Sequence, residues 1–151
     1  MAANDTAVCT REQVDPRGPR FGGAVTTVVL ALALLMIGTT AGTVLIAWQT
    51  LVFALGSIIG LQAQPYGIVY RSLVQPRLGP PAELEDAAPP RFAQTVGLVF
   101  LVVALVASLL GATLVAGIAV AMALAAAFLN AAFGFCLGCE MYLIGKRLAH
   151  R

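Results

Sequence analysis

The chain has 151 residues, of which 60% are hydrophobic and 11% are charged, and its mean hydropathy is +0.91. A soluble domain carries about 25% charged residues, so this composition excludes a soluble globular protein. The net charge is +2 and the basic residues form no concentrated patch, which argues against nucleic-acid binding. We therefore expect one compact domain that lies in a lipid bilayer.

Charged residues are absent from two long stretches of the chain. No Lys, Arg, Asp, Glu or His lies between Arg20 and Arg71, or between Arg91 and Glu140. Each stretch far exceeds the roughly 20 residues that one helix needs to cross a bilayer. We therefore predict an all-α polytopic membrane protein, a bundle of four transmembrane helices in two hairpins, with helices at about 21–38, 43–61, 92–110 and 114–142.

The segments outside these helices differ in composition. Residues 1–18 are polar and are expected to form a disordered tail, whereas residues 148–151 form a basic tail after the membrane domain of residues 19–147. The loop of residues 62–90 connects the two hairpins. Its second part is rich in proline, which favours an extended, stiff spacer.

All nine Lys and Arg residues fall on one side of this arrangement. Because cytoplasmic loops of membrane proteins carry an excess of Lys and Arg, both termini and the loop of residues 62–90 are predicted to be cytoplasmic. A multi-pass protein of the cell (plasma) membrane is expected. A cleaved signal peptide is disfavoured, because the first apolar stretch continues past Gly38 into a second span.

One seven-residue pattern occurs twice. Asp-x-x-x-Pro-Arg-Phe spans residues 15–21 and residues 86–92, each time just before a hairpin. Either the hairpins form a parallel pseudo-repeat or the match arose by chance, and the pattern leaves both open. An arginine at the headgroups with a phenylalanine just inside is typical of a membrane anchor, so the candidate anchors and charge partners are Arg20, Phe21, Arg91 and Phe92.

Two polar residues lie deep inside predicted helices. Gln49 belongs to the second helix and Asn130 to the fourth. A neutral polar side chain within a span more often makes a hydrogen bond between helices than forms a site. We expect that packing role for both residues.

The side chains with chemical reactivity gather near the end of the fourth predicted helix. Cys136, Cys139 and Glu140 share one helical face. The 22 residues from Leu114 to Cys136 extend roughly 33 Å as a helix, which places these side chains at the cytoplasmic edge of the bilayer. The candidate site is a C-x-x-C redox pair, with Glu140 tuning it or relaying a proton. Cys9 is a possible third thiol on the same side.

The predicted helix end works against this chemistry. A thiolate is favoured at a helix N-terminus or beside a cation, whereas the predicted position is near a helix C-terminus and next to Glu140. Activation of the pair is therefore expected to need a nearby arginine, either Arg20 or Arg91.

Two other interpretations of the cysteines stay open. Two thiolates and a carboxylate can hold zinc, so Cys136, Cys139 and Glu140 are a weak alternative metal site. Alternatively, the cysteines are small buried hydrophobic residues. The protein is then a non-enzymatic membrane scaffold or a small transport subunit with structural cysteines. The sequence does not identify a cofactor.

Three motifs resemble a known family. They are VDPRGPRF at Val14–Phe21, PRLGPPAELEDAAPPRFAQ at Pro76–Gln94 and FLNAAFGFCLGCEMY at Phe128–Tyr142. They are similar to the actinobacterial integral membrane protein family catalogued as domain of unknown function 4395, and the resemblance extends from Val14 to about Arg147. The family has no established activity. Its members are often encoded near thioredoxin-like and sulfurtransferase proteins, which implies thiol or sulfur chemistry with a partner of that kind.

Overall fold

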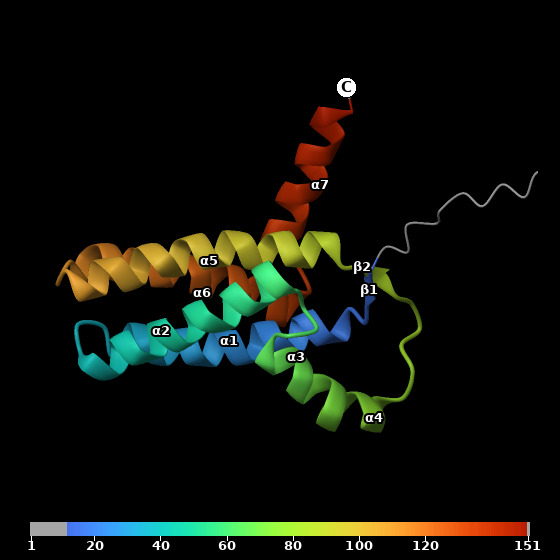
Figure 1. Ribbon diagram of the computed structural model, residues 1–151, viewed down its shortest axis with the longest axis horizontal. Helices are drawn as coiled ribbons and strands as arrows, with labels where there is room; N and C mark the ends of the chain where they lie inside the picture. Colours follow the sequence, from blue (N-terminus) through green and yellow to red (C-terminus); the bar gives the residue numbers. More distant parts are fainter. Residues whose placement is uncertain (1–11, 151) are drawn as a thin grey trace, which may run out of the picture.

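The computed structural model describes residues 12–150, and four long helices run side by side through it (Figure 1). They are α1 (Arg17–Leu35), α2 (Thr40–Ala54), α5 (Ala88–Leu109) and α6 (Thr113–Phe133). Short turns at residues 36–39 and 110–112 join them in pairs at one end of the bundle. The prediction of an all-α bundle made of two hairpins is confirmed.

Four helical segments have the length and hydropathy of membrane spans. They are Arg17–Leu35, Thr40–Ile59, Ala88–Leu109 and Thr113–Phe133, and their mean hydropathy lies between 1.5 and 2.3. Their outward side chains are largely aliphatic, which suits lipid and not water. The chain is a multi-pass membrane protein associated with the lipid bilayer.

Small residues allow the helices to approach closely. The core contains large side chains with no exposed surface, such as Leu30, Ile46 and Leu101, interleaved with buried alanines such as Ala104 and Ala116. α1 packs mainly on α6, and α2 packs on α5, so the two hairpins pack against each other along both of their helices. Close packing through small residues is the main source of helix association inside a membrane.

A chain of hydrogen bonds holds the one fully buried amide of this core. Gln49 Nε2 donates to Thr26 Oγ1 at 3.1 Å, and Gln49 Oε1 accepts from the Tyr66 hydroxyl at 2.9 Å. Trp48 Nε1 in turn donates to the Tyr66 oxygen at 3.0 Å. Gln49 has no exposed surface. The prediction that Gln49 makes a packing hydrogen bond is confirmed.

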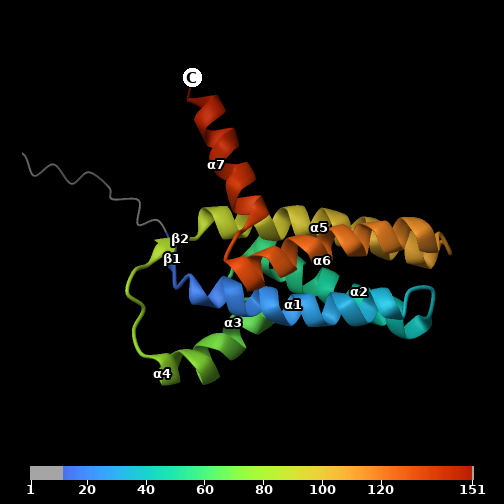
Figure 2. The same cartoon turned by 180° about the vertical axis from the view of Figure 1, so that it is seen from behind.

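The other end of the bundle, the basic end, carries residues 12–16, 60–87 and 134–150 (Figures 1 and 2). Two short strands, β1 (Gln13–Val14) and β2 (Glu85–Asp86), pair there antiparallel, with Gln13 opposite Asp86. The pairing ties together the two segments that precede the hairpins.

The two copies of the seven-residue pattern make matching contacts. Asp15 accepts a hydrogen bond from the backbone N–H two residues later, at 3.0 Å, and Asp86 does the same at 2.9 Å. The phenylalanine of each copy packs on a tyrosine with a centroid distance of 5.8 Å, in the pairs Phe21–Tyr70 and Phe92–Tyr142. Equivalent contacts in both halves favour a pseudo-repeat over a chance match.

The arginines of the two copies also correspond. Arg91 donates to the carbonyls of Ser57 and Ile58, at the end of the first hairpin. Arg20 lies over Gly134, at the end of the second hairpin. A Cβ added at Gly134 would lie 3.6 Å from the guanidinium carbon of Arg20. Each arginine therefore covers the end of the other hairpin, which is an internal contact in addition to the predicted anchoring.

The loop of residues 62–90 is more helical than expected. It contains α3 (Pro65–Val69), the π-helical turn η2 (Tyr70–Val74) and α4 (Gln75–Leu78). A second π-helical turn, η1 (Leu55–Ile59), ends the second span. Pro65 stands in the first turn of α3, where the missing N–H costs nothing. The extended spacer is limited to residues 79–84.

The expectation of one helix from residue 114 to residue 142 is wrong. α6 ends at Phe133, and Gly134 adopts the left-handed conformation with φ of 66°. Glycine reaches this conformation without the steric cost that other residues incur, and it ends helices for that reason. A separate helix, α7 (Leu137–Ala149), then runs across the direction of the bundle (Figures 1 and 2).

Candidate functional site

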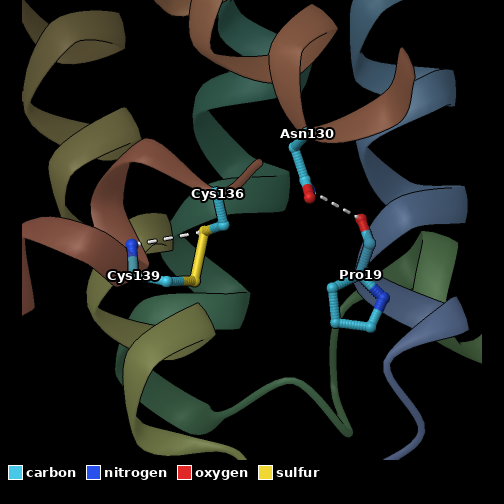
Figure 3. The surroundings of a disulfide bond; sticks show 4 residues. All are labelled: Pro19, Asn130, Cys136 and Cys139. Carbon is cyan, nitrogen blue, oxygen red and sulfur yellow. Dashed lines mark hydrogen bonds between the residues drawn. A yellow bond between two sulfur atoms is a disulfide. The ribbon is translucent and has the colours of Figure 1, made fainter. Parts of the chain in front are cut away.

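The two cysteines of the C-x-x-C pair lie in the first turn of α7. Cys136 is the N-cap residue of this helix, and Cys136 and Cys139 are joined by a disulfide with a Cα–Cα distance of 5.1 Å (Figure 3). The backbone N–H of Cys139 donates to Cys136 Sγ at 3.3 Å. Both residues are half-buried, so the pair sits at the surface of the bundle and not in its core.

The helix break reverses the electrostatics that the sequence led us to expect. A continuous helix would have placed the pair near a C-terminus, whereas the pair lies at an N-terminus. Unpaired N–H groups and the helix dipole stabilise a negative charge there by about 0.3–1 kcal/mol. When the pair is reduced, the α7 N-terminus therefore favours the thiolate of Cys136.

Glu140 lies in the same first turn, but its side chain is exposed to solvent. Its backbone N–H donates to the Cys136 carbonyl at 3.0 Å, which closes the turn around the pair. The carboxylate itself makes no hydrogen bond or ion pair with any residue in 12–150. Glu140 is thus placed beside the pair without being fixed to it.

The two arginines predicted as activating groups have different neighbours, and Arg20 is the one that lies against the segment leading into the pair. Its guanidinium lies against Gly134, two residues before Cys136. Arg91 instead binds the carbonyls at the end of the first hairpin. The predicted third thiol, Cys9, lies outside the residues that the structure describes.

A cavity of about 330 Å³ adjoins the disulfide. It lies between α1, α5, α6 and the start of α7, and Cys136 forms part of its wall. Asn130 borders it as well and donates from Nδ2 to the Pro19 carbonyl at 3.2 Å (Figure 3). The hydrogen bond between helices predicted for Asn130 is confirmed, but its position beside a cavity was not foreseen.

Glycines line this cavity and mark places where the surrounding segments approach one another closely. Gly22, Gly23, Gly97 and Gly138 all line the space. A Cβ added at Gly97 would overlap the Phe53 ring, and one added at Gly138 would lie 2.6 Å from Ala93. Glycine in a span usually indicates close helix packing, so the sequence alone does not separate that role from the lining of a cavity.

A second polar cluster fixes the N-terminal segment to the connecting loop. Asp15 is paired with Arg17 at 2.9 Å and accepts from the Tyr70 hydroxyl at 2.9 Å. Burial works to raise the pKa of Asp15, but the hydrogen bonds from Arg17 and Tyr70 outweigh it, so the pKa is lowered from 3.8. Burial and the bond to Asp15 raise the pKa of Tyr70. Both carboxylate oxygens of Asp15 and the Tyr70 hydroxyl are paired, which indicates a structural role for the cluster.

The alternative metal site receives no support from the geometry. Within residues 12–150, no three His, Cys, Asp or Glu side chains lie close enough together to hold a metal ion. The sulfur atoms of Cys136 and Cys139 are bonded to each other. The structure brings Glu140 into the same helical turn as the cysteine pair, and it places Arg20 against Gly134, two residues before Cys136.

Comparison with known proteins identifies one family. A family model described as a domain of unknown function (DUF4395) matches residues 14–147. No curated protein and no solved structure gives a significant match to the chain. Since the match covers nearly the whole sequence, including both hairpins and the cysteine pair, the chain belongs to the DUF4395 family.

Proposed function

We propose that this protein is a membrane-bound thiol–disulfide exchange protein that works through Cys136 and Cys139. The observation that carries the proposal is the position of the pair: two bonded cysteines in the first turn of α7, half-buried, at the end of a rigid bundle. Thiolate stabilisation at a helix N-terminus is the feature that makes a cysteine pair reactive. Purely structural cysteines need neither exposure nor that location.

The exchange begins at Cys136. A thiolate of a partner protein attacks Cys136 Sγ, the bond to Cys139 breaks, and Cys139 leaves as a thiolate that takes up a proton. A second thiol of the partner then attacks the mixed disulfide. The partner leaves oxidised, and the pair has gained two electrons and two protons. Cys136 forms the mixed disulfide because its sulfur occupies the N-cap and accepts the Cys139 N–H.

The partner proposed here is a thioredoxin-like or sulfurtransferase protein in the cytoplasm. The described basic residues outside and at the ends of the spans all lie at the basic end of the bundle, together with the cysteine pair. The excess of Lys and Arg on the cytoplasmic side supports a plasma-membrane protein with both termini and the pair facing the cytoplasm. A reporter fused at residue 40 tests this orientation, and a cytoplasmic signal there would contradict it.

Trapping of mixed disulfides tests the proposed exchange. In Cys139→Ser, the Cys136 thiolate attacks the disulfide of an oxidised partner, which is the reverse of the exchange above, and no Cys139 thiol is present to release the partner. Adducts through Cys136 are therefore expected to accumulate in cells. Cys136→Ser is the matched control and is expected to give few adducts, because Cys139 is not the N-cap residue. If neither variant forms adducts, the exchange is refuted. The protein is then a scaffold or transport subunit with structural cysteines.

A further inference from the structure

The cavity beside the disulfide lies within the membrane part of the protein. Its wall includes Thr26, Gly97 and Met122, which belong to three different spans, and most of its lining is apolar. Pockets of about 300–1,000 Å³ with apolar walls and a few polar groups are typical of small-molecule sites. At about 330 Å³, this cavity is large enough for a ring-sized ligand that dissolves in the bilayer.

Two amide groups in the cavity wall retain unused donors. Asn130 Nδ2 carries two N–H groups and donates one hydrogen bond, to the Pro19 carbonyl. Gln94 uses Oε1 to accept from Gln64 at 3.1 Å, and its Nε2 donates to no residue in 12–150. Gln94 Nε2 is not fully buried, so this donor is accessible to a ligand. A ligand with carbonyl oxygens would satisfy these groups, whereas an acyl chain would not.

The disulfide lies at the wall of this cavity. Cys136 contributes directly to the cavity, so a ligand there lies next to the disulfide. Exchange with a partner leaves the pair reduced, and further turnover needs an acceptor of two electrons. A bilayer-soluble acceptor with a flat ring and carbonyl oxygens is a quinone.

We infer that the cavity between α1, α5, α6 and α7 binds a membrane quinone, which reoxidises Cys136 and Cys139. The redox half of this inference rests on the proposed function. The two thiols lose two electrons and two protons and form the disulfide, and the quinone takes up both to become the quinol. Electrons thus pass from the partner through the pair to the membrane.

Binding is tested separately from redox chemistry. The full chain in lipid nanodiscs, with Cys136→Ser and Cys139→Ser combined, is titrated with a decyl-substituted benzoquinone by equilibrium dialysis. One saturable site is expected. Ala126→Phe fills the cavity wall and is expected to weaken binding at least tenfold. Gly117→Ala on the same helix is the control, since its Cβ meets no atom within 4 Å, and it should bind as the parent does.

Asn130→Leu provides a second variant in case Ala126→Phe does not fold. It removes an amide donor from the cavity wall and is also expected to weaken binding. Circular dichroism and gel filtration establish that each variant remains folded. Absence of binding to the double serine variant, or undiminished binding to both cavity variants, overturns the site.

The redox step is tested with reduced wild-type protein under anaerobic conditions. One quinol and one Cys136–Cys139 disulfide are expected per protein, and Ala126→Phe should slow the reaction. Binding without thiol oxidation would overturn the role of the quinone as acceptor. Mixed-disulfide trapping uses only the cysteines, so failure of the quinone site is distinguishable from failure of the exchange itself.

Discussion

The contact between α7 and α5 allows a sharp prediction at Gly138. A Cβ added at Gly138 would lie 2.6 Å from Cα and Cβ of Ala93, and neither atom belongs to a flexible side chain. Gly138→Ala must therefore push the two helices apart, and overpacking of this kind costs about 1–3 kcal/mol. The change lies between the two cysteines and therefore loosens the helix turn that carries them.

Gly145→Ala is the matched control for this variant. It makes the same substitution in the same helix, but its Cβ would meet no atom within 4 Å. Replacing glycine with alanine in a helix is by itself favourable by up to about 1 kcal/mol. The two variants therefore differ by the packing cost, which corresponds to about 5- to 150-fold in the equilibrium constant for release of α7.

Hydrogen–deuterium exchange in nanodiscs measures that release. Amides of α7 are expected to exchange faster in Gly138→Ala than in wild type, and equally fast or more slowly in Gly145→Ala. If the α7 amides exchange at the same rate in both variants, α7 does not pack on Ala93 in the way described. The placement of the cysteine pair is then wrong as well.

Three further predictions concern the stability of the bundle. Gln49→Leu removes the acceptor of the buried Tyr66 hydroxyl, so thermal unfolding in detergent should show a loss of about 1–3 kcal/mol; an unchanged melting temperature would contradict this. The pKa of Asp15 is lowered from 3.8 in the folded protein, so its contribution to the free energy of unfolding is complete above that value and is lost as the pH falls through the lower folded pKa. Melting temperatures measured between pH 7 and pH 3 should show this loss. Asp15→Asn should abolish that part of the pH dependence. Gly42→Ala would overlap the Met36 carbonyl in the first turn and should destabilise the bundle, whereas Gly117→Ala, which meets no atom within 4 Å, should not.

The bundle could be predicted because charges are excluded from the hydrocarbon core. The two uncharged stretches are each too long for one span, and glycines near their centres leave room for a turn. Gln49 and Asn130 were placed correctly for a similar reason, since a polar side chain at that depth needs a partner within the protein. These predictions depend on which residues the bilayer excludes and on the length of the uncharged stretches, and both can be read from the sequence.

The helix break could not be predicted with the same security. Gly134 and Gly138 were visible as weak points, but a glycine inside a helix is tolerated at about 1 kcal/mol. Whether the helix continues depends on the packing of Gly138 on Ala93 and on Arg20 covering Gly134. Both are contacts with other helices. A continuous helix would have placed Cys136 near a helix C-terminus, whereas the break places it at the N-terminus of α7.

The repeat shows how a weak pattern gains support from contacts. Four identical residues within the seven-residue stretches 15–21 and 86–92 were compatible with chance. The pairs Phe21–Tyr70 and Phe92–Tyr142 add a second correspondence. Each tyrosine stands six residues after the N-cap of the helix that follows its hairpin, and those N-caps are Gln64 and Cys136. The first half thus carries a glutamine, Gln64, at the N-cap equivalent to Cys136.

The reactivity of Cys136 is the most direct test of the account. Its rate of alkylation by iodoacetamide, followed against pH in the Cys9→Ser, Cys139→Ser variant, gives the pH at which the thiolate forms. A short unstructured peptide with the same sequence around Cys136 is the reference. The position of Cys136 at the N-terminus of α7 predicts a midpoint at lower pH in the protein than in the peptide. A midpoint equal to that of the peptide, or higher, would contradict the proposed exchange site.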